Sequence, residues 1–175
     1  YAGDGVSGLF VFGAQAETGK VATSYIPTGA TTVTRAVDAV QKLPFNGFFD
    51  ALSGSVEGEV RSLYVPTSNN YMLNFYSDGS NYVSIQIVGN AMGAWINKGG
   101  VIKSLIDNVP SATEFFKFKL LWGHGTMSLQ INSQTPVTLA LLDAEIPTIS
   151  NFKVGFWSST LFNGEIKYLI LDKNL

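Results

Sequence analysis

Hydrophobic and polar residues alternate along most of this chain, and turn-forming residues interrupt the alternation about every eight to twelve positions. Val56 and Val60, for example, alternate with Glu57, Glu59 and Arg61. Successive side chains of a strand point to opposite faces, so this segment, extended to Tyr64, predicts a strand with one buried face. Regular short strands separated by turns favour an antiparallel all-β sandwich or barrel.

Two pairs of segments have the pattern of β-hairpins. Residues 71–76 and 82–88 flank a turn at residues 77–80, where the Asp78-Gly79 pair is expected to supply a positive φ. Residues 115–122 and 127–131 flank Gly123-His124-Gly125. Further strands are expected at residues 91–96, 152–157 and 165–171. Residues 101–108 and 140–145 are the two segments that are compatible with short helices. Pro110 and Pro147 follow them closely and would end such helices.

The alternation also predicts which side chains face the core. The inward set comprises Val60, Leu73, Phe75, Val83, Ile85, Ile87, Phe118, Leu120, Leu129 and Ile131. Trp122 continues this inward register, whereas Trp95 lies near a turn and is the best candidate for an exposed aromatic, although a core position stays open for it. The outward set comprises Glu59, Arg61, Asn74, Tyr76, Ser84, Gln86, Lys117, Lys119 and Gln130.

Aromatic and planar polar side chains on an outward face suit the recognition of sugars, although any solvated sheet has a similar composition. The carbohydrate-binding candidates are Glu59, Arg61, Asn74, Tyr76, Gln86 and Trp95.

Composition excludes several functional classes. The 175 residues contain no cysteine, which removes disulfides and thiolate metal sites. A net charge of -2 argues against a nucleic-acid partner. No apolar run approaches the ~20 residues of a membrane-spanning helix, so no membrane insertion is expected. Only 14% of residues are charged and 13% are aromatic, which indicates apolar surface covered by self-association.

Catalysis and metal binding have little support. Glu57 and Glu59 form an acidic pair on one strand face, but sandwich glucanases show a pattern resembling E-x-D-x-x-E. Here the central Asp and the last Glu are missing, and Arg61 is expected to pair with Glu59 and keep it ionised. The single histidine, His124, reads as a turn residue. The segment most similar to a calcium-binding loop is residues 78–81, whose composition is also ordinary for a hairpin turn without an ion. Neither a metal nor a cofactor is expected.

A longer motif gives the chain a context. Residues 13–28 read GAQAETGKVATSYIPT and residues 32–38 read TVTRAVD. They resemble the "GAQLE…TSYIPT…VTRAAD" signature of bacteriophage tail-fibre and minor tail proteins, with Ala16 in place of Leu and Val37 in place of Ala. In that family the motif leads into a concanavalin-A-like sandwich. The resemblance implies an extended N-terminal β arm at residues 1–37 and a sandwich at residues 38–175. Within the arm, the apolar run at residues 9–12 predicts a strand covered on both sides.

The later part of the chain shows a second resemblance. Residues 117–120, 128–132 and 162–171 are similar to the back half of laminin-G and concanavalin-A-like domains. Together the two resemblances imply an all-β, two-sheet antiparallel jelly-roll sandwich of the concanavalin-A-like type. They imply a tail-fibre receptor-binding domain, a homotrimer in the virion that is not an enzyme and recognises host bacterial surface polysaccharide or lipopolysaccharide. The alternatives are a polysaccharide depolymerase that uses Glu57 and Glu59, and a purely structural trimerisation tip.

Overall fold

The computed structural model of the protein describes residues 14–16, 25–27, 29–33, 40–41, 52–157 and 160–172. Contacts within the chain divide it into two units, Tyr1–Val37 and Asp38–Leu175. The described residues of the first unit form no strand, and the N–H of Ile26 donates a hydrogen bond to Oε1 of Gln15 over 2.8 Å. The predicted strand at residues 9–12 lies outside the described residues, while residues 29–33 of the predicted arm are exposed.

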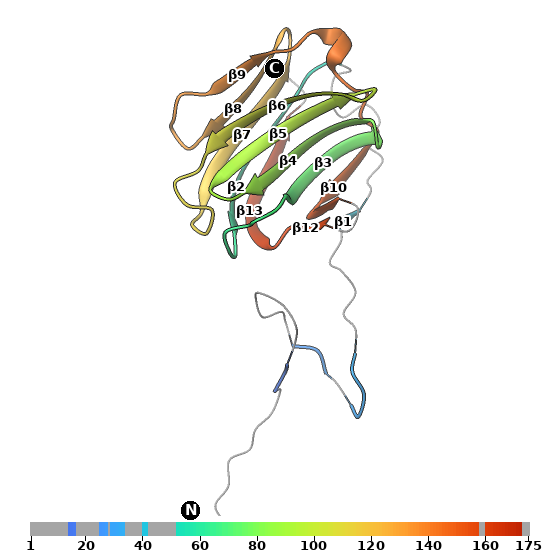
Figure 1. Cartoon of the computed structure of the whole chain (residues 1–175), viewed down its shortest axis with the longest axis vertical. Coiled ribbons are helices and arrows are strands. Elements are labelled where there is room, and N and C mark those ends of the chain that lie inside the picture. Colours follow the sequence, from blue (N-terminus) through green and yellow to red (C-terminus); the bar gives the residue numbers. More distant parts are fainter. Residues whose placement is uncertain are drawn as a thin grey trace, which may run out of the picture. The chain divides into compact units, whose positions relative to one another are not determined.

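The second unit consists of two antiparallel sheets packed face to face (Figure 1). The first sheet has the order β1-β10-β3-β4-β5-β6, with bounds β1 Val40–Gln41, β10 Asn151–Val154, β3 Asn70–Asp78, β4 Asn81–Val88, β5 Ala91–Lys98 and β6 Val101–Asn108. The second has the order β13-β2-β7-β8-β9, with bounds β13 Gly164–Asp172, β2 Gly54–Ser62, β7 Phe116–Gly123, β8 Thr126–Ile131 and β9 Val137–Ala140. A small ribbon of β11 (Phe156–Trp157) and β12 (Thr160–Leu161) and the 3-10 helix η1 (Asp143–Glu145) complete the described elements. The predicted two-sheet antiparallel sandwich is confirmed.

The core lies between the two sheets, where the sequence pattern placed it. All ten residues of the predicted inward set are buried. Trp122 is also buried, and its ring lies 5.9 Å from that of Phe75, which stacks on Phe152 at 4.9 Å between ring centroids. Full burial of one such large apolar side chain stabilises the fold by roughly 1.5–3 kcal/mol.

The hairpin predictions are confirmed, but one of their turns works differently. Gly79 does not have a positive φ, so the prediction that the Asp78-Gly79 pair supplies one is wrong. The Asp78 carboxylate holds this turn instead, accepting hydrogen bonds from the N–H of Ser80 (2.8 Å) and Nδ2 of Asn81 (3.0 Å). The turn between β7 and β8 does use positive φ, at His124 (+50°) and Gly125 (+89°), so His124 is a turn residue as predicted.

Residues 101–108, where the sequence left a short helix possible, form strand β6. Every residue of β6 has a register partner on β5, from Val101 opposite Lys98 to Asn108 opposite Ala91. The predicted helix at residues 140–145 is reduced to η1, which begins at Asp143. Lys103 of β6 connects the two segments, since its Nζ donates to Oε2 of Glu145 over 2.7 Å and to the carbonyl of Ala140 over 3.1 Å.

Candidate functional site

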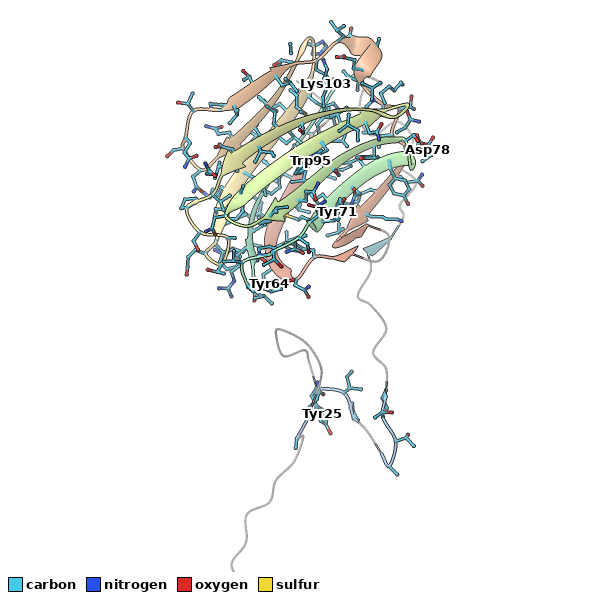
Figure 2. The ribbon with its side chains drawn as sticks, in the orientation of Figure 1. Tyr25, Tyr64, Tyr71, Asp78, Trp95 and Lys103 are labelled. Carbon is cyan, nitrogen blue, oxygen red and sulfur yellow. The ribbon has the colours of Figure 1, made fainter. Side chains whose placement is uncertain are left out.

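The outer face of the six-stranded sheet is the side that points away from the core. Because side chains alternate along a strand, the pairing register arranges this face in rows that cross β3, β4, β5 and β6 in turn. The three rows are Tyr71–Gln86–Gly93–Ile106, Asn74–Ser84–Trp95–Ser104 and Tyr76–Tyr82–Asn97–Ile102. None of these side chains is charged. Figure 2 shows Trp95 and Tyr71 on this sheet.

Trp95 lies near the centre of the outer face, in the middle of the three rows. A Cβ placed on Gly93, two residues earlier on β5, would come within 2.0 Å of Cη2 and 2.3 Å of Cζ3 of Trp95. The six-membered ring of the indole therefore occupies the space that any larger residue at position 93 would fill. The side chain is half-buried, so part of the indole is exposed on this face.

Polar side chains lie buried beside the indole. Ser84 is opposite Trp95 in the register and is 1% exposed, while Gln86 is opposite Gly93 and is 3% exposed. Neither Ser84 Oγ nor Gln86 Oε1 has a hydrogen-bond partner among the described residues. A buried polar atom without a partner costs roughly 1–3 kcal/mol of folding free energy, so two of them side by side need an explanation.

Tyrosines surround this central group. Tyr71, Tyr76 and Tyr82 of the outer rows are each half-buried. Lys153 of β10 lies on the same face, opposite Asn74, with its Nζ 4.9 Å from the centre of the Tyr76 ring. The face thus combines aromatic rings and uncharged polar groups, with Lys153 as a cation toward its β10 side.

The opposite side of the sandwich is a different kind of surface. On the outward side of β2, Glu57 pairs with Lys119 over 3.5 Å and Glu59 pairs with Lys167. Arg61 pairs with Glu165 over 3.0 Å, so the prediction that it would pair with Glu59 is wrong. Partly exposed ion pairs of this kind contribute about 0–1 kcal/mol each.

This charged surface also contains an aromatic ring. The guanidinium of Arg61 lies 4.7 Å, and Nζ of Lys167 4.1 Å, from the ring centre of Phe115. Glu57 and Glu59 are therefore each paired with a lysine of a neighbouring strand.

The six predicted carbohydrate-binding residues therefore do not form one group. Asn74, Tyr76, Gln86 and Trp95 lie together on the outer face of the six-stranded sheet. Glu59 and Arg61 lie on the opposite side of the sandwich, on the five-stranded sheet. The prediction also missed Tyr71, Tyr82 and Gly93 of the same rows; the Gly93-x-Trp95 spacing on one strand is the signal that marks the seat of the indole.

Metal ligands are scarce in the described part of the chain. It contains no cluster of three or more His, Cys, Asp or Glu side chains that could hold a metal ion. At residues 78–81, hydrogen bonds from the backbone of Ser80 and the side chain of Asn81 hold the pKa of Asp78 below its usual value. No helix among the described elements is long and apolar enough to cross a membrane.

Comparison with known proteins finds similarity of structure alone. No family model and no curated protein sequence matches the chain. Domains LG4-5 of the mouse laminin alpha1 chain share the fold with a TM-score of 0.58 at 15% identity, covering 69% of this chain and 35% of that one. The CBM40 domain of the Ruminococcus gnavus IT-sialidase, solved with alpha2,3 sialyllactose, has a TM-score of 0.58 at 12% identity and covers 71% and 78%.

Toxin domains share the same architecture. The binding domain of botulinum neurotoxin DC, solved with rat synaptotagmin II, has a TM-score of 0.58 at 11% identity and covers 70% of this chain and 32% of its own. The domain is a concanavalin-A-like jelly-roll sandwich. The chain spans about a third of the length of the laminin and toxin structures it matches.

Proposed function

We propose that this domain is a non-catalytic carbohydrate-binding module and that its site is the outer face of the six-stranded sheet. The observation that carries the proposal is Trp95, a half-buried indole on the outer face whose six-membered ring reaches over Gly93. The C–H bonds on one side of a sugar ring carry small positive partial charges, which are attracted to the negative face of an indole. A nearby hydroxyl, that of the half-buried Tyr71, can bind the hydroxyl groups at the sugar's rim.

The structural neighbours support a carbohydrate ligand. The sialidase CBM40 domain was solved with a sialylated sugar, and entry of botulinum neurotoxin type C depends on two ganglioside molecules. The toxin domain has a TM-score of 0.56 at 14% identity. At such low identity these neighbours support only the idea that a sandwich of this fold can carry a sugar-binding site. The location proposed here rests on the side chains of this chain.

The motif at residues 13–38 extends the proposal to a biological context. Its resemblance to tail-fibre proteins supports a receptor-binding domain in the virion that attaches to polysaccharide or lipopolysaccharide on a host bacterium. Three linked copies would turn weak single contacts into firm attachment, because the first bound site raises the effective concentration of the others. A homotrimer measured by light scattering after size exclusion would agree with this extension.

The proposal is tested by comparing matched variants on the two faces of the sandwich. Trp95→Ala removes the stacking surface, whereas Glu59→Gln alters the opposite face and should leave binding intact. Both are screened on an array of bacterial polysaccharides and by competition with phage for host cells. We expect loss of binding in Trp95→Ala alone. Binding that survives in Trp95→Ala, or no binding by the wild type to any glycan or cell, would contradict the proposal; a trimer that binds nothing would favour a structural tip.

A further inference from the structure

Two buried polar atoms on the outer face, Ser84 Oγ and Gln86 Oε1, have no hydrogen-bond partner among the described residues. Ser84 and Gln86 lie two residues apart on β4, with both side chains on the outer face and roughly 7 Å between their Cα atoms. Folded proteins pair nearly all of their buried polar atoms. Two neighbouring exceptions, Ser84 Oγ and Gln86 Oε1, indicate that a ligand supplies the missing hydrogen bonds.

Trp95 is the large side chain next to both of these residues. It is opposite Ser84 in the register, and its ring leans over Gly93, which is opposite Gln86. The ring lies where a Cβ of residue 93 would stand, so no side chain on its own strand holds it from beneath. Rotation of Trp95 to another staggered χ1 position would lift the indole away from Gly93 and open the space beside the two polar atoms.

We propose that Trp95 is a movable lid and that an uncharged sugar ring binds beneath it. Hydroxyl groups of the sugar donate hydrogen bonds to Oε1 of Gln86 and Oγ of Ser84, while the displaced indole stacks on the ring. This inference rests on the carbohydrate-binding function proposed above and adds the class of ligand.

The class of ligand follows from the absence of charged side chains in the three rows of the outer face. A carboxylate or sulfate beside Gln86 would meet an acceptor oxygen. The cation of this face, Lys153, is on β10, which pairs with the far edge of β3 rather than with β4. Oε1 of Gln86 therefore needs a donor, which a sugar hydroxyl supplies and an ionised acidic group does not, while the Ser84 hydroxyl can donate or accept.

The test uses three variants of the full chain. Ser84→Ala and Gln86→Met remove the unpaired atoms with little change of volume, and Ser128→Ala is the matched control, because Ser128 lies on β8 of the opposite sheet, outside the proposed site. Affinity is measured by calorimetry against glucose-, galactose- and mannose-based tetrasaccharides, with tetragalacturonate as the charged comparison. Stability is measured by thermal unfolding.

We expect Ser84→Ala and Gln86→Met each to weaken binding of a neutral tetrasaccharide about tenfold, which is about 1.4 kcal/mol. Their unfolding temperatures should stay equal or rise, since each loses an unpaired buried atom. Ser128→Ala should leave the affinity unchanged. A merely structural role would give the reverse result, namely lower stability with unchanged affinity.

Movement of the lid is followed by fluorine NMR of protein labelled with 5-fluorotryptophan, with the Trp95 resonance assigned from Trp95→Phe. We expect this resonance to shift when the sugar binds, whereas a resonance that stays fixed in saturated protein overturns the lid. Binding that needs Trp95 but is unchanged in Ser84→Ala and Gln86→Met overturns this inference alone. Preference for tetragalacturonate overturns the ligand class, and binding of none of the sugars overturns both this inference and the proposed function.

Discussion

Replacement of Gly93 by alanine tests the position of the Trp95 ring directly. The added methyl would stand 2.0 Å from Cη2 and 2.3 Å from Cζ3 of Trp95, far inside the ~3.5–4.0 Å that carbon atoms prefer. The ring must leave its seat, and overpacking of this kind costs about 1–3 kcal/mol. Gly93 has no positive φ, so alanine fits the backbone and returns about 0.5–1 kcal/mol through lower unfolded-state entropy. We expect a net destabilisation of about 1 kcal/mol.

The control is the same substitution without the ring. In a Trp95→Ala background, Gly93→Ala should stabilise the protein by about 0.5–1 kcal/mol, because nothing remains to be displaced. Urea denaturation of all four proteins, followed by circular dichroism, gives the coupling free energy, which we expect to be about 1–3 kcal/mol. If Gly93→Ala changes stability equally in both backgrounds, the ring does not lie over Gly93 and the reasoning about the outer face is refuted.

Three further results follow from the same structure. Gly58→Ala should destabilise the fold by about 1–3 kcal/mol in urea denaturation, because its Cβ would stand 2.7 Å from the backbone oxygen of Tyr168, whereas Gly79→Ala, with nothing within 4 Å, should be near neutral; equal effects would contradict this. The lowered pKa of Asp78 means that its carboxylate stabilises the fold above the usual pKa of 3.8 and loses this effect as the pH falls through the folded value. Asp78→Asn should therefore be less stable than wild type at neutral pH and approach it in acid, and a gap that persists in acid unfolding would refute the turn assignment. Finally, incubation with host capsule should release no reducing ends from the wild type, and release that disappears in Glu59→Gln would establish the depolymerase alternative instead.

The layers of this fold could be predicted from alternation because burial acts on each strand separately. Phe75 and Val83 face the core as expected, since each strand must hide its apolar side. Alternation could not decide whether residues 101–108, which form β6, are a strand or a helix. Its apolar residues Val101, Ile102, Leu105 and Ile106 have a spacing that also suits one face of a helix. Pairing with β5 decides in favour of a strand, and that partner is set by the tertiary structure.

The candidate site shows a similar limit. Alternation separates inward from outward side chains, but it does not say which of two sheets an outward residue belongs to. Glu59 and Arg61 were therefore grouped with Asn74 and Trp95, although they lie on opposite sides of the sandwich. The ion pair between Arg61 and Glu165 was missed for a related reason, since it joins residues 104 positions apart through the pairing of β2 with β13.

The central claim, that sugars bind the outer face of the six-stranded sheet, is tested most directly by amide NMR of the isotope-labelled chain during titration with host surface polysaccharide. The account predicts shifts concentrated on β3, β4 and β5 around Tyr71, Gln86 and Trp95. Shifts concentrated instead on β2 and β13 around Glu59 and Glu165, with the amides around Trp95 unchanged, would contradict it.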